Sequence, residues 1–94
     1  MSNALTELKS TTQVLLQALR KGDLDKGREA VSVLLMQGIT LLGRESSVMQ
    51  QFFPVWSAIE KHIDAGNVAG ALGQTETWNR QLDEVIEIVR SAQR

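Results

Sequence analysis

The last quarter of the chain carries the most regular alternation of apolar and polar positions. Eight positions, all apolar except one threonine, recur at alternating intervals of three and four residues: Val68, Ala71, Thr75, Trp78, Leu82, Val85, Val89 and Ala92. The charged residues of this stretch fall on the opposite side of a helix: Glu76, Arg80, Asp83, Glu84, Glu87, Arg90 and Arg94. The pattern predicts an amphipathic helix over 68–92 with one buried face and one solvated face. Ile86 and Ile88 flank the apolar stripe, which indicates that this helix contacts more than one neighbour near its end.

The same spacing predicts three further helices upstream, over roughly 4–21, 24–43 and 47–65. The first is one-sided: four leucines lie on one face with a threonine in the slot between them, in the order Leu5, Leu8, Thr12, Leu15 and Leu19. We therefore expect an all-α fold.

Glycines mark the ends of the first three predicted helices, at Gly22, Gly43 and Gly66. A glycine directly after a helical pattern is typical of a left-handed C-terminal cap. Asp23, Ser47 and Asn67 come after these glycines and can act as N-caps of the next helices. The corners at Gly22 and Gly66 lie 44 residues apart and share one pattern, so we expect two αα-hairpins in tandem. The prediction is a four-helix up-down bundle in a single domain, 1–94.

Pro54 interrupts the third predicted helix. Inside a helix, proline removes one hydrogen bond and its ring clashes with the preceding turn. We expect this helix to be kinked or broken near Pro54, around Gln50-Gln51, and to resume through Val55, Ile59 and Ile63.

The second predicted helix has too many apolar residues for a single buried face. Residues 30–42 contain no charge, and a plausible inward face comprises Val31, Leu34, Leu35, Gly38, Leu41 and Leu42. Val33, Met36 and Ile39 then point elsewhere. Either this helix is central in the fold, or its outer face contacts another chain.

The segment 52–56, Phe-Phe-Pro-Val-Trp, is the most apolar aromatic cluster in the sequence. On a helix, two of its four large side chains can point inward, but not all four. This excess, added to that of the second helix, predicts a partner interface made by Val33, Met36, Ile39, Phe52, Phe53 and Trp56. An alternative interpretation is that the two apolar excesses cover each other within one chain.

The sequence therefore favours protein–protein interaction as the function. The protein would be a small helical adaptor, chaperone or assembly subunit that binds a protein partner or forms a homodimer. The alternative is a regulatory bundle that holds a small apolar ligand in a pocket near Trp56 and Trp78.

The titratable residues do not form a recognisable catalytic or cofactor site. The chain has no cysteine and one histidine, His62, which has no plausible partner for catalysis or metal binding. We therefore expect no enzymatic activity, no metal and no cofactor. A net charge of −1 without a basic cluster argues against nucleic-acid binding. The longest uncharged stretch, 30–43, is too short to span a membrane. Together with the lack of cysteine, this fits a cytoplasmic protein.

One further prediction joins sequence spacing to packing. If the third and fourth helices form an antiparallel hairpin around Gly66-Asn67, residues at the same height have numbers that sum to about 133. Trp56 and Trp78 meet this condition, so the two indoles should lie at one level of the bundle.

Overall fold

The computed structural model describes residues 2–43 and 47–92; the side chains of residues 2–4, 41, 42 and 48 lie outside this description. The described chain forms four helices: α1 (Ser2–Arg20), α2 (Leu24–Leu42), α3 (Ser47–Asp64) and α4 (Val68–Ala92). The all-α prediction is confirmed, and the predicted helix ends lie within two residues of the observed ones.

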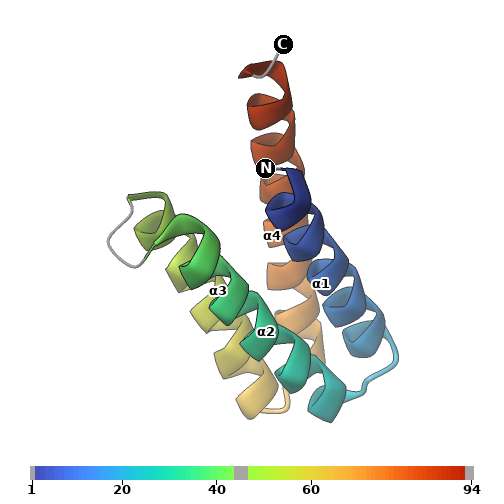
Figure 1. The fold of residues 1–94 in the computed structure, drawn as a ribbon. Helices are drawn as coiled ribbons and strands as arrows, with labels where there is room; N and C mark the ends of the chain where they lie inside the picture. Colours follow the sequence, from blue (N-terminus) through green and yellow to red (C-terminus); the bar gives the residue numbers. More distant parts are fainter. Residues whose placement is uncertain (1, 44–46, 93–94) are drawn as a thin grey trace.

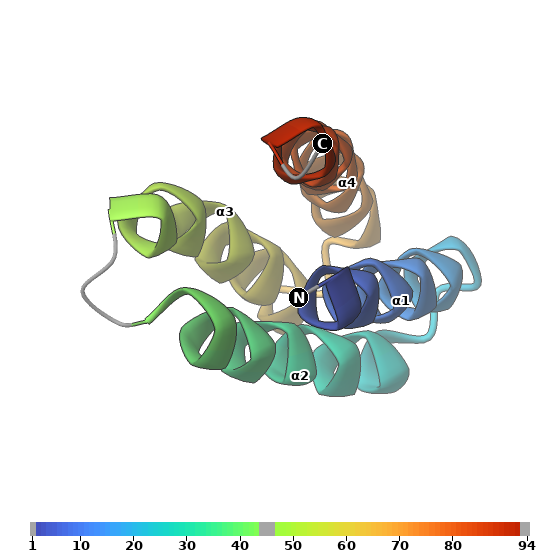
Figure 2. The same cartoon turned by 45° about the horizontal axis from the view of Figure 1, so that its top comes forward.

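Successive helices run in opposite directions, and the four pack in a ring (Figure 1). α1 packs on α2 and α3 on α4, which are the two predicted hairpins. α2 against α3 and α1 against α4 close the ring (Figure 2). The last turns of α4 extend past the beginning of α1 (Figure 1). The fold is thus the expected up-down bundle.

The corners that connect the helices within each hairpin have the same hydrogen bonds. In the first, Gly22 N–H donates to the Leu19 carbonyl at 3.0 Å and Asp23 N–H to the Ala18 carbonyl at 2.8 Å. Around Gly66 the equivalent bonds measure 3.0 Å and 2.8 Å. Both glycines have positive φ, 74° and 73°, which a side chain would disfavour. The predicted helix-ending role of these two glycines is confirmed.

Two of the three predicted N-caps are present, whereas Ser47 is the first residue of α3. Asp23 Oδ1 accepts from Lys26 N–H at 3.1 Å, and Asn67 Oδ1 accepts from Gly70 N–H at 3.0 Å. Each side chain satisfies a backbone donor that the first turn of a helix leaves free. Local sequence therefore determines both corners.

Burial repeats at the 44-residue spacing that separates the two corners. Eight pairs of buried residues are related by it: Leu8 and Phe52, Thr12 and Trp56, Leu15 and Ile59, Leu19 and Ile63, Gly27 and Ala71, Val31 and Thr75, Leu34 and Trp78, Gly38 and Leu82. The two hairpins are thus structural counterparts, and each position in one can be compared with the position 44 residues later in the other.

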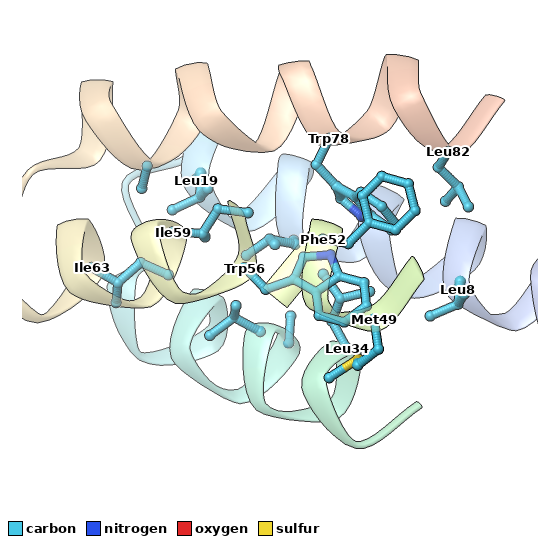
Figure 3. Close-up of a cluster of buried hydrophobic side chains, with 14 residues drawn as sticks. Leu8, Leu19, Leu34, Met49, Phe52, Trp56, Ile59, Ile63, Trp78 and Leu82 are labelled. Atoms are coloured by element: carbon cyan, nitrogen blue, oxygen red, sulfur yellow. The ribbon is translucent and has the colours of Figure 1, made fainter. Parts of the chain in front are cut away.

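The core is built around three aromatic rings, which Figure 3 shows among the aliphatic side chains of all four helices. Trp56 and Trp78 meet edge to face, with ring centroids 5.1 Å apart and an interplanar angle of 88°. Phe52 contacts Trp78 at 5.2 Å, also edge to face. Trp56 and Trp78 are 0% and 1% exposed. The predicted register of α3 and α4 is confirmed.

Two buried threonines satisfy their hydroxyl groups on the backbone of their own helices. Thr12 donates to the Leu8 carbonyl at 2.8 Å, and Thr75 donates to the Ala71 carbonyl at 2.7 Å. Thr12 Oγ1 also accepts from Trp78 Nε1 at 3.0 Å, which connects α1 to α4 inside the core. Thr12 therefore occupies a position in the apolar stripe of α1 because its hydroxyl group accepts the hydrogen bond of a buried indole N–H.

α3 is continuous from Ser47 to Asp64, with Pro54 inside it. Of the two outcomes that Pro54 led us to expect, a broken helix is wrong. Proline removes the hydrogen bond to the Gln50 carbonyl, but Pro54 and Gln50 are both exposed, on the side where water can bind that carbonyl. Packing of Phe52 and Trp56 into the core, on either side of Pro54, holds the helix together.

Candidate interaction surface

The six residues predicted to form a partner interface fall into two groups. Phe52 and Trp56 belong to the core and are 7% and 0% exposed, so Trp56 lies out of reach of a partner and Phe52 offers little surface to one. Val33, Met36 and Phe53 are exposed on the surface. Ile39 is half-buried and packs against the edge of the core.

This division follows from the packing of α3. Phe52 and Trp56, four residues apart, face inward together, whereas Phe53 points away with 45% of its surface exposed. Two large side chains of the segment 52–56 therefore face fully inward, as the sequence suggested. The structure thus reduces the predicted interface to four residues with accessible surface, Val33, Met36, Ile39 and Phe53, which we call the α2/α3 surface.

The counterpart positions in the other hairpin provide an internal reference for the α2/α3 surface. Val33 corresponds to Thr77, Met36 to Arg80, Ile39 to Asp83, and Phe53 to Lys9.

These four counterparts are polar or charged. Lys9 Nζ donates to Asp83 Oδ1 at 2.6 Å and to Asn79 Oδ1 at 2.7 Å, across the contact between α1 and α4. Arg80 donates to Thr77 Oγ1 at 3.5 Å along α4. The same places in the other hairpin therefore hold polar side chains, and of the four apolar residues on α2 and α3 only Ile39 packs against the core.

The Lys9–Asp83 ion pair also indicates how the α2/α3 surface is arranged. The counterparts of Ile39 and Phe53 are in direct contact, and Ile39 and Phe53 occupy the equivalent positions on α2 and α3, which pack against each other. Met36, 70% exposed, lies one helical turn from Ile39 and from Val33. Three of the four residues thus follow one another along α2, and the fourth lies on the adjoining helix α3.

The apolar surface extends onto α1 through a residue that sequence reasoning missed. Val14 is 43% exposed and lines a shallow groove, together with Thr11, Lys26, Glu29, Ala30 and Val33. This groove has a volume of about 270 Å³. The sequence provides little indication of this, because Val14 lies next to the apolar stripe of α1. A residue at such a position is usually a half-buried member of the core.

The alternative hypothesis of a ligand pocket near Trp56 and Trp78 is narrowed by the contact between the two rings. They are in direct contact, so no ligand fits between them. Neither indole is among the residues that line the grooves at Val33, at Ile88 and at Lys21.

His62, the only histidine in the sequence, packs against the beginning of α4. It is half-buried at the end of α3, where its Nδ1 lies 3.2 Å from Asn67 Nδ2. A side chain at Gly70 would meet His62 Nδ1 at 2.6 Å, so α4 begins directly against the imidazole. The ring therefore packs in the corner between α3 and α4.

Within 2–43 and 47–92, no three His, Asp or Glu side chains gather in a way that could hold a metal ion. Among the helices described, none combines the length and apolarity needed to cross a membrane.

Comparison with known proteins identifies no relative. No protein-family model matches the chain, and neither the curated proteins nor the solved structures contain a match.

Proposed function

We propose that this protein is a protein–protein interaction module that forms a homodimer through the α2/α3 surface. The observation that supports the proposal is the internal comparison. At four equivalent places, one hairpin carries Val33, Met36, Ile39 and Phe53, and the other carries polar residues. Exposed apolar side chains that the fold does not need are typical of an interface.

The charge distribution favours a second copy as the partner. The sequence has no charged residue from Ala30 to Gly43, nor from Ser47 to Ile59. In a two-fold dimer each surface meets itself, so any charge near the axis faces a like charge. An uncharged apolar surface avoids this repulsion and offers no charge by which to select a charged partner.

The energy available is adequate for a small interface. Complete burial of an exposed methionine or phenylalanine side chain contributes about 1.5–3 kcal/mol. Met36 and Phe53 are 70% and 45% exposed, so both would bury much of their surface. We expect the dimer to bury at least about 1,000 Å² in total.

Light scattering after size-exclusion chromatography at micromolar concentration tests the proposal. The expected mass is twice 10.4 kDa for the native chain and 10.4 kDa for Met36→Asp. Because Met36 is 70% exposed, this substitution leaves the core intact, which circular dichroism can verify.

Ile88→Asp is the matched control, since Ile88 is 67% exposed but lies on α4, away from the α2/α3 surface. This variant should remain dimeric. A monomeric native chain, or a Met36→Asp variant that stays dimeric, would refute the proposed assembly.

A further inference from the structure

A second apolar feature lies between the first half of α3 and the second half of α4. This α3–α4 cleft has a volume of about 410 Å³. Its apolar wall is formed by Phe52, Val85, Ile88 and Val89. Its polar groups belong to Gln51, Gln81 and Glu84. It is separate from the α2/α3 surface, with which it shares no residue.

Gln81 is held in this cleft with an unmet hydrogen-bonding requirement. Its Oε1 atom is buried and has no donor among the described residues. Its counterpart, Gln37, accepts a hydrogen bond from Thr11 Oγ1 at 2.8 Å. The position equivalent to Thr11 is Val55, which has no side-chain donor. The side-chain oxygen of Gln81 is therefore buried beside the cleft without a hydrogen-bond donor. An unpaired acceptor of this kind is unfavourable when it is buried.

The cleft is also extended by the greater length of α4. α2 ends at Leu42, whose counterpart is Ile86, but α4 continues to Ala92 (Figure 1). The additional turns carry Ile88, 67% exposed, and Val89. Both line the cleft, so the extension of α4 adds apolar side chains to the cleft that have no counterpart on the shorter helix α2.

The polar groups of the cleft define the chemistry of an occupant. Glu84 is the one charged residue among the described residues that line it. Gln81 Oε1 is buried beside it, so its amide accepts from a partner only after turning into the cleft. A cationic donor pairs with Glu84, and the adjoining wall binds apolar side chains. We propose that the α3–α4 cleft binds an amphipathic helix of a partner protein, with leucine-like residues against Val85, Ile88 and Val89 and a lysine or arginine that pairs with Glu84 and draws the Gln81 amide toward it. This inference does not depend on the dimer proposed above.

A peptide titration tests the proposal. The probe is a helical peptide of about 14 residues, with leucines on one face at helical spacing and lysines on the other. It is added to the isotope-labelled full chain, and binding is followed by amide chemical shifts. We expect saturable shifts at Gln81, Glu84 and Ile88. A matched peptide with glutamate in place of lysine should bind about tenfold more weakly or worse.

Two variants assign the binding to the cleft. Ile88→Asp should abolish binding of the lysine peptide, whereas Met36→Asp, with similar exposure on α2, should bind it with unchanged affinity. Glu84→Gln retains the shape of the side chain and should weaken binding several-fold at low salt, with a smaller loss at high salt.

Three results would overturn the proposal. These are equal binding of the two peptides, shifts located away from the cleft, and a fall in the mass of the chain when Ile88 is replaced. The last would mean that a second copy occupies the cleft. Because Met36→Asp tests the dimer and Ile88→Asp tests the cleft, failure of one proposal is distinguishable from failure of the other.

Discussion

Gly38 is the position where a single added methyl group tests the packing of this bundle most directly. It is buried in α2, where that helix crosses the indole of Trp56. A Cβ atom at this position would clash with both Cη2 and Cζ3 of Trp56. Trp56 is 0% exposed and its ring contacts Trp78 at 5.1 Å, so it cannot move away freely. Gly38→Ala must therefore separate α2 from α3 or displace the aromatic cluster.

The expected magnitude is a balance of two effects. Overpacking a core costs about 1–3 kcal/mol. Replacing glycine by alanine inside a helix contributes about 0.5–1 kcal/mol in the opposite direction. The difference spans about 0–2.5 kcal/mol. Because the Trp56 ring cannot move away freely, we expect Gly38→Ala to lie in the upper part of this range and to lower the free energy of unfolding by about 1–2 kcal/mol. For a domain of this size, Tm should fall by roughly 5–15 °C.

Gly73→Ala is the control that isolates the packing effect. Gly73 also lies inside a helix, but it is exposed, and an added Cβ would meet no atom within 4 Å. This variant should be more stable than the native chain by about 0.5–1 kcal/mol. Urea unfolding followed by circular dichroism, at one protein concentration for all chains, provides the comparison. If Gly38→Ala is as stable as Gly73→Ala, the close contact between α2 and Trp56 does not exist.

Two further substitutions probe the core where α1 meets α4. Thr12→Val keeps the side-chain shape but removes the acceptor 3.0 Å from Trp78 Nε1, so urea unfolding should show a loss of about 1–3 kcal/mol; an unchanged midpoint would show that the indole has another acceptor. Trp78→Ala removes the ring that contacts both Phe52 and Trp56 and should cost about 3–5 kcal/mol, a large part of the stability of a small domain. A loss below about 1 kcal/mol would mean that the aromatic cluster does not organise the core.

The elements of this fold and the register of α3 against α4 could be predicted from the sequence alone. Gly22 and Gly66 end helices through backbone conformation and hydrogen bonds within a few residues, so neighbouring sequence suffices to locate them. The position of Trp56 opposite Trp78 follows from a short antiparallel connection and a fixed rise per residue. These features depend on local geometry, which the order of residues determines.

The exposed surface and the detailed packing were decided by contacts between helices. Sequence pattern grouped Phe52, Phe53 and Trp56 as one apolar cluster, but the positions of α2 and α4 determine that Phe53 alone is exposed. Of the kink or break that Pro54 predicted in α3, the break is wrong, because the core contacts of Phe52 and Trp56 keep the helix continuous. The unpaired oxygen of Gln81 depends on Val55 occupying the place where the other hairpin has Thr11. Each outcome depends on which side chains from distant parts of the chain fill the same space, and only the tertiary structure determines that.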